Sequence, residues 1–316
     1  MLHHPGVPSF LGRALLCVMT VGLPLLAPIA KAEVTSPVLL INSEAESAEV
    51  KINHLRDNVS LITGSGGNIV VLAGREGKLL GDAGIAVSKA RLQAALSTLG
   101  PAPVKYVINT HYHWDHTDGN AWMHEAGATI VAHQNTRNRL ASGTRVIEWG
   151  YTFPPAVPAA LPTIVFDKEK NIDFEGETVV LKHYGTGHTD TDVSIYFSKA
   201  DVLQLGDIWW NGYYPFLDNG AGGSIDGLIR WVNHCIDAST DRTIIIPGHG
   251  EPSNRAGLTE FRDMLVAVRA NVSRLKHEGR TLAETIGAKP TAAYDGKYGQ
   301  FLIGPAFFIQ LVYMGV

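Results

Sequence analysis

The stretch NTHYHWDHTDGN, residues 109–120, contains four possible metal ligands within six positions: His111, His113, Asp115 and His116. Side chains two residues apart in an extended segment point the same way, so His111 and His113 can bind one ion. Asp115 and His116, at the turn into a helix, can point toward a second position nearby. One ion cannot use all four side chains in this arrangement. The stretch therefore indicates two metal ions side by side.

Three further candidate ligands follow segments that are expected to be strands. His188, Asp207 and His249 each stand directly after a glycine that ends a β-rich segment. Glycine lets the backbone turn sharply at the end of a strand, which presents the next side chain at the edge of the sheet. One edge thus collects five histidines and two aspartates. We expect a metal centre there.

A purely structural role for these residues is less favoured. A structural zinc site is usually closed, four-coordinate and rich in cysteine, whereas this set has no cysteine and leaves coordination open to water. The remaining histidines after residue 32 are interpreted as surface or hydrogen-bonded core residues. His183 is the one that could also line the pocket, because it lies on the segment that leads to His188. The full group is His54, His124, His133, His183, His234 and His277.

The elements expected around the first ligands are a sheet followed by helices. Short β-rich segments separated by turn residues occupy residues 49–84. An amphipathic helix is expected over 88–100, a buried strand over 104–110 and a helix over 119–127, which Thr117 or Asp118 can cap. A strand over 128–132 and a helix over 134–140 complete this half.

The second half has the same order. Strands are expected over 177–185, 193–198, 201–206 and 243–248, and helices over 224–238 and from about residue 258 onward. Two successive groups of strands followed by helices predict two sheets packed face to face with helices outside. Residues 149–162 contain four prolines and are expected to form an ordered loop over one edge.

Four motifs, THYHWDH, GTGHTDTD, LGDIWW and IPGHG, occur in this order and resemble those of the metallo-β-lactamase superfamily over about residues 50–251. The resemblance implies a four-layer αββα sandwich and two Zn²⁺ ions as cofactors, with iron or manganese as alternatives. It also implies the ligand sets: His111, His113 and His188 for one ion, Asp115, His116 and His249 for the second, and Asp207 bridging them.

The implied chemistry is hydrolysis by a metal-activated hydroxide. Two ions ~3.5 to 4 Å apart can share this nucleophile, because metal binding lowers the pKa of water toward neutrality. Asp115 would hold the second ion and take part in proton transfer, so it is the expected catalytic residue. Three side chains are candidates for hydrogen bonds that orient the imidazoles, namely Asp82, Thr189 and Asp190.

The residue at position 207 distinguishes between two groups of enzymes in this superfamily. Zinc β-lactamases of the usual types have cysteine or serine there, whereas glyoxalase II-like thioesterases have an aspartate. The expected function is therefore an exported dinuclear zinc hydrolase that cleaves a small carbonyl substrate, a thioester, ester or lactone. A periplasmic zinc β-lactamase is the alternative, and a metal-binding protein without turnover is a third hypothesis. The aromatic segment 209–216 is interpreted with equal weight as core or as pocket wall, and Asn211 could be an oxyanion donor.

The first 32 residues are expected to be a signal peptide that is removed before Glu33. Arg13 precedes the apolar run 14–29, which two prolines interrupt, and residues 30–32 have small side chains at the spacing of a cleavage site. The run is shorter than the ~20 residues of a membrane span, so no stable membrane anchor is expected after cleavage. This pattern predicts a periplasmic or secreted protein with a single hydrolase domain over 33–316.

Composition excludes some partners. Without Arg13 and Lys31, 24 of the 26 basic side chains remain against 30 acidic ones, which gives a net charge of −6. No basic run is present, so nucleic acid is not an expected partner. Cys235 is the single cysteine after residue 32 and is expected to be a buried, inert thiol. The sequence does not predict the oligomeric state.

Overall fold

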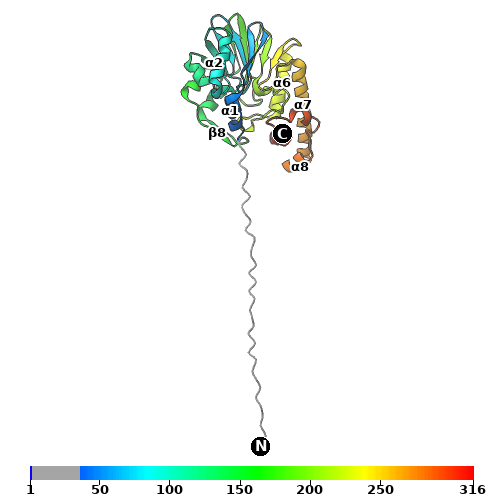
Figure 1. Ribbon diagram of the computed structural model, residues 1–316. Coiled ribbons are helices and arrows are strands. Elements are labelled where there is room, and N and C mark those ends of the chain that lie inside the picture. Colours follow the sequence, from blue (N-terminus) through cyan, green and yellow to red (C-terminus); the bar gives the residue numbers. More distant parts are fainter. Residues whose placement is uncertain (2–35) are drawn as a thin grey trace. The chain divides into compact units, whose positions relative to one another are not determined.

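Two β-sheets lie face to face between layers of helices (Figure 1). The computed structural model describes Met1 and residues 36–316 of the chain. The predicted signal peptide and its cleavage site lie outside the described residues, apart from Met1. The remainder of the chain forms one unit. The observed layers confirm the predicted αββα sandwich.

The first sheet has seven strands in the order β1-β2-β3-β4-β5-β6-β9. Strands β1 to β4 are joined by short turns and pair antiparallel, whereas β4, β5, β6 and β9 pair parallel and need helical crossovers between them. The strands are β1 Lys51–Arg56, β2 Val59–Thr63, β3 Ile69–Ala73, β4 Lys78–Gly81, β5 Val104–Ile108, β6 Thr129–His133 and β9 Ile164–Phe166.

The second sheet has five strands in the order β10-β11-β12-β13-β14. Its strands pair antiparallel except for β13 and β14, which are parallel because helix α6 (Ile225–Ala238) connects them. The strands are β10 Glu169–Phe174, β11 Glu177–Lys182, β12 Ser194–Phe197, β13 Val202–Gln204 and β14 Ile244–Ile246.

The core between the sheets is made of the inward side chains of both, for example Leu61 and Val70 from the first and Leu181 and Phe197 from the second. Because side chains alternate along a strand, the other faces need separate covers. Helices α2 (Lys89–Thr98) and α4 (Asn120–Glu125) cover the first sheet. Helices α6, α7 (Arg255–His277) and α10 (Pro305–Gly315) cover the second.

The C-terminal helices begin with α7 at Arg255, three residues before the expected start at about residue 258. Asn254 fixes that start, since its side-chain oxygen accepts the N–H groups of Ala256 and Gly257 at 3.0 and 3.2 Å. Helices α8 (Leu282–Gly287) and α9 (Asp295–Tyr298) precede α10. Over residues 36–316, no helix combines the length and the apolar character that crossing a bilayer requires.

The predicted cap of α4 was wrong. The metal-rich stretch forms a helical turn of its own, α3 (Trp114–Thr117), and Asp118 already has helical dihedral angles, whereas a capping residue needs an extended backbone. The Asp118 carboxylate instead accepts the Ala86 N–H at 2.8 Å. Thr117 donates its hydroxyl to the His113 carbonyl at 3.0 Å.

Two segments differ from the predicted loops and strands. The proline-rich segment 149–162 contains β8 (Tyr151–Phe153), which pairs with β7 (Thr144–Val146), because the first proline follows the strand rather than interrupting it. Helix α1 (Pro37–Ser47) precedes the first strand and was not predicted. Helix α5 (Gln134–Ser142) is close to its predicted range.

Candidate metal centre

All seven predicted ligands lie together at one edge of the two sheets. Ligand atoms of His111, His113, His188 and Asp207 lie within 4.8 Å of one another, and those of Asp115, His116 and His249 form a second group by the same limit. The first sheet provides the stretch after β5. The second sheet provides the side chains that follow β11, β13 and β14. The centre therefore exists only where the two sheets meet.

Close contacts between glycines and ligand side chains explain part of this arrangement. A Cβ on Gly67 would lie 2.1 Å from Cε1 of His116, and a Cβ on Gly248 would lie 2.0 Å from Oδ1 of Asp207. Only glycine lets the backbone approach so closely. Gly206, at the turn before Asp207, has a φ of +53°, which agrees with the sharp turn expected from the sequence.

The unsatisfied polar atoms of the site fit metal ions. Nε2 of His111, His116 and His188 and Oδ1 of Asp207 are buried without a hydrogen-bond partner among the described residues. A buried polar atom left without a partner costs about 1–3 kcal/mol, so four in one place call for a bound group. Imidazole and carboxylate donors suit a divalent metal such as zinc.

Asp207 faces both groups of ligands. Its Oδ2 lies 3.6 Å from Nε2 of His111 and 3.8 Å from Nε2 of His188. Its Oδ1 lies 3.1 Å from Nε2 of His116 and 3.4 Å from Nε2 of His249. One carboxylate with an oxygen toward each group has the arrangement of a bridging ligand.

The charges of the site also favour cations. Burial raises the pKa of Asp207, but His249, His116 and His111 outweigh that effect and hold it well below its usual range. Burial lowers the pKa of His249, yet the carboxylates of Asp207 and Asp115 raise it to about 9. Burial also raises the pKa of Asp115, but His116 and His249 hold it below its usual range, so both carboxylates are ionised and positive charge is favoured between them.

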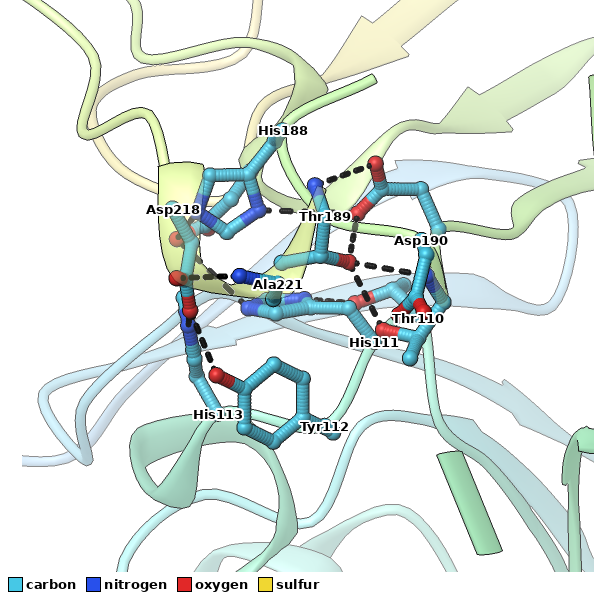
Figure 2. Close-up of polar contacts among 12 residues, drawn as sticks. Thr110, His111, Tyr112, His113, His188, Thr189, Asp190, Asp218 and Ala221 are labelled. Atoms are coloured by element: carbon cyan, nitrogen blue, oxygen red, sulfur yellow. Dashed lines mark hydrogen bonds and ion pairs between the residues drawn. The ribbon is translucent and has the colours of Figure 1, made fainter. Parts of the chain in front are cut away.

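Further carboxylates contact the imidazoles of the candidate ligands. Figure 2 shows one of them, Asp218, beside His113 and Tyr112. Oδ2 of Asp82, one of the three predicted positioning residues, lies 2.8 Å from Nδ1 of His116, and Oδ1 of Asp82 accepts the backbone N–H of Thr110 at 2.7 Å. Oδ2 of Asp218 lies 3.0 Å from Nε2 of His113 and accepts the hydroxyl of Tyr112 at 2.5 Å. Each contact fixes which ring nitrogen faces the centre.

Asp218 was missed from the sequence, and so was Asp192, whose Oδ1 lies 3.5 Å from Nδ1 of His188. Burial raises the pKa of Asp218, but its hydrogen bond with His113 and the charge of that ring bring the pKa to about 2. Thr189, a predicted positioning residue, acts one step away, because its hydroxyl donates to Asp192 at 2.8 Å. Asp190, the third candidate, instead accepts two hydrogen bonds from Arg139, at 2.6 and 2.8 Å.

The comparison with known families agrees with this geometry. The metallo-beta-lactamase superfamily matches residues 62–249, more than half of the chain. The chain belongs to this superfamily. The cluster of histidine and aspartate donors at the edge of the two sheets lies within or directly beside the matched segment and could hold metal ions.

Two similar proteins carry the names of different enzymes. A hydroxyacylglutathione hydrolase from Polaromonas sp. is 28% identical over 174 residues, which are 52% of this chain and 58% of that protein. The chain thus spans little more than half the length of this curated relative. The stereoselective inverting sec-alkylsulfatase Pisa1 from Pseudomonas sp. has a TM-score of 0.64 at 17% identity over 84% of this chain and 50% of the sulfatase.

Two solved metallo-beta-lactamases align over nearly their whole length. DIM-1 has a TM-score of 0.55 at 19% identity and covers 69% of this chain and 97% of that enzyme. The metallo-beta-lactamase from Hirschia baltica has a TM-score of 0.54 at 24% identity, with 68% and 97% covered. At these identities the likeness shows the metallo-beta-lactamase fold alone.

In this superfamily member, a cavity of about 180 Å³ opens beside the second group of ligands. Asp115, Asp207 and His249 line it on the side of the metal centre. The other side chains that line it are mainly aromatic or aliphatic. They are Ile41, Ala45, Ala48, Trp114, Trp149, Trp210, Phe301 and Leu302, with Glu44 and two glycines.

The aromatic segment 209–216 contributes to both the core and the cavity wall. Trp209, Tyr214 and Phe216 are fully buried in the core beneath the helices. Trp210 lines the cavity, with its ring centre 4.4 Å from that of His249. The side-chain amide of Asn211 donates to the Glu251 carbonyl at 2.7 Å, so the proposed oxyanion donor is occupied elsewhere.

Two other residues singled out in the sequence lie away from the cavity. His183 stacks on His133 with ring centres 4.0 Å apart, and its Nδ1 lies 2.7 Å from the Asp192 carbonyl oxygen. Cys235 is buried in the core, as predicted, and burial raises the pKa of its thiol. Neither residue has a place in the chemistry of the centre.

Proposed function

We propose that this protein is a dinuclear zinc hydrolase that cleaves a thioester, ester or lactone. The observation that carries the proposal is Asp207, whose two carboxylate oxygens face different groups of donors at 3.1 to 3.8 Å. The first ion would be held by His111, His113 and His188, and the second by Asp115, His116 and His249, with Asp207 between them.

When bound, the ions supply a Lewis acid and lower the pKa of water toward neutrality. The side chains of the protein accept the proton, exclude bulk water and orient the imidazoles. Asp115 lines the cavity, so its carboxylate can take the proton of the attacking water while it keeps its position beside His249, 3.3 Å away. Trp114, Trp149 and Trp210 exclude bulk water from the reacting group. Asp82 and Asp218 keep the imidazoles oriented.

A zinc β-lactamase is the second candidate. Its support is the alignment with DIM-1 over 97% of that enzyme, together with the export signal expected from the sequence. The aspartate at position 207 favours the first candidate, because its charge offsets that of both ions and leaves the second ion less able to bind a lactam nitrogen. A thioester or ester leaving group departs readily as an anion and needs less of this assistance.

Export to the periplasm or the medium is part of the proposal. Its support is the basic, apolar and small-residue pattern of residues 13–32. Expression of the full sequence with a C-terminal tag, followed by fractionation and N-terminal sequencing, tests it. We expect an exported product that begins at Glu33; a full-length product in the cytoplasm would contradict the proposal.

The test of the reaction is a panel of kcat/KM values on one zinc-loaded preparation. It includes simple thioesters, esters and lactones beside penicillins, cephalosporins and carbapenems. We expect the thioesters and esters to be cleaved faster. A β-lactam with kcat/KM near ~10⁵ M⁻¹s⁻¹, within the usual range of enzymes on their own substrates, and thioesters far below it would favour the β-lactamase.

Asp115→Asn tests the role of the carboxylate in the same assay. It keeps the side-chain shape and should lower kcat by ~10²- to 10⁴-fold, the usual contribution of a general base. Asp118→Asn is the matched control, since its carboxylate binds the Ala86 N–H at an exposed position. Normal zinc content and a near-normal rate in Asp115→Asn would remove this residue from the mechanism.

A further inference from the structure

Helix α1 is an ordered wall of the active-site cavity. Ser36, just before the helix, donates its hydroxyl to the Trp149 carbonyl at 2.9 Å, and Asn42 accepts the indole N–H of Trp114 at 3.1 Å. Ser88 donates its hydroxyl to the Ala45 carbonyl at 3.2 Å. The helix is thus tied to two of the tryptophans that line the cavity. Its residues lie before the segment that matches the superfamily, which starts at residue 62.

Glu44 gives this wall a charge. It is the one charged side chain along the cavity besides the candidate ligands, and no lysine or arginine of residues 36–316 lines it. Within the same part of the chain, the Glu44 carboxylate has neither a hydrogen bond nor an ion pair. Glu44 is exposed, and the other residues of helix α1 and its C-cap that line the cavity, Ile41, Ala45 and Ala48, are aliphatic. A carboxylate of a bound molecule placed against this helix would therefore meet a like charge there, whereas the cations of the zinc-loaded protein are held by the ligands on the side of the metal centre.

We propose that Glu44 is a specificity-determining residue that disfavours substrates with a negative charge on the acyl group. The cavity then takes neutral esters, thioesters or lactones with a compact apolar acyl group, which its aromatic walls and its volume of about 180 Å³ suit. The part of the inference that concerns turnover rests on the proposed function, but a measurement of ligand binding alone can test the role of Glu44.

The first experiment compares two esters that differ in one group, 4-nitrophenyl butyrate and 4-nitrophenyl hemisuccinate. The zinc-loaded protein should prefer the neutral ester. Glu44 is exposed. For like charges about 8 Å apart with mostly solvent between them, Glu44→Gln should raise kcat/KM for the hemisuccinate relative to the butyrate about two- to sixfold, and Glu44→Lys about six- to thirtyfold. The change should shrink in 0.5 M NaCl, because salt screens exposed charges.

Glu46→Gln is the matched control. Glu46 is an exposed residue of the same helix that does not line the cavity, so its substitution removes the same charge from the protein. We expect it to leave the ratio of the two esters within twofold of wild type. An equal change in Glu44→Gln and Glu46→Gln would assign the effect to net charge and overturn the proposal.

The second experiment measures binding and needs no turnover. Butyrohydroxamic acid and succinic acid monohydroxamate are titrated into the zinc-loaded protein, and quenching of the tryptophans that line the cavity reports binding. Glu44→Lys should improve the relative affinity for the anionic hydroxamate about six- to thirtyfold. An unchanged ratio would overturn the proposal, even where esters are hydrolysed. The expected shift without hydrolysis of any ester would support the role of Glu44 and refute the proposed reaction.

Discussion

Replacing Asp218 by asparagine should weaken zinc binding without unfolding the protein. Oδ2 of Asp218 lies 3.0 Å from Nε2 of His113, and its Oδ1 accepts the Ala221 N–H at 2.9 Å. The asparagine oxygen can still accept one of these hydrogen bonds, so the shape of the site is kept. What is lost is a buried negative charge that makes the imidazole of His113 a stronger ligand.

The magnitude follows from this contact. Removing such a partner of a metal-bound histidine typically costs about 10- to 100-fold in metal affinity. That range corresponds to about 1.4–2.7 kcal/mol of binding free energy. Asp218 is 3% exposed, so solvent cannot replace the lost charge, and we expect a value toward the upper end.

The assay is competition for zinc against a chelator of known affinity, with metal content measured after gel filtration. Asp190→Asn is the control, because the Asp190 carboxylate binds Arg139 and does not contact an imidazole. Thermal unfolding of both metal-free variants checks that the fold is intact. Wild-type zinc affinity in Asp218→Asn, or an equal loss in both variants, would refute the argument.

Three further predictions follow. The protein spanning residues 33–316 should contain about two zinc ions per chain by elemental analysis, because seven donors exceed the four positions of a tetrahedral ion; one ion at full activity would contradict the dinuclear site. Gly67→Ala places its Cβ 2.1 Å from Cε1 of His116 and should lower the free energy of unfolding by about 1–3 kcal/mol in urea titration. Gly287→Ala is the control, because Gly287 lies in helix α8 and an added Cβ there would meet no heavy atom within 4 Å. It should leave the free energy of unfolding unchanged or raise it by up to about 1 kcal/mol, and a loss equal to that of Gly67→Ala would show that crowding is not the cause. Cys235 should stay unlabelled by a thiol reagent at pH 8 in the native protein, because burial raises the pKa of its thiol and keeps it protonated, whereas rapid labelling would contradict its burial.

The candidate ligands could be predicted because their signals are local. Each follows a β-rich segment within a few residues, and strands of one sheet end at common edges. Asp82 also follows a strand directly, at the end of β4. Asp218 carries no such signal, since it lies in a turn-like sequence 105 positions from His113. Its role depends on how the two halves pack, which periodicity does not encode.

Elements that depend on tertiary contacts were also missed. Helix α1 has only two buried side chains, Val38 and Ala45, so its sequence lacks an apolar stripe. Its position depends on hydrogen bonds with Trp114, Trp149 and Ser88. Strands β7 and β8 have three residues each, too few to show alternation. The signal peptide and export remain predictions.

The division of the candidate ligands between two sheets makes metal loading a late step of biosynthesis. His111, His113, Asp115 and His116 are synthesised first and can attract a cation, but neither group of ligands is complete at that stage. The first group gains Asp207 only with β13, and His249 follows the last strand. Because binding free energy accrues only as the halves dock, the ion that is abundant at that moment is favoured when the centre first fills. Refolding in manganese, iron or zinc should therefore yield differently metallated forms of the same sequence.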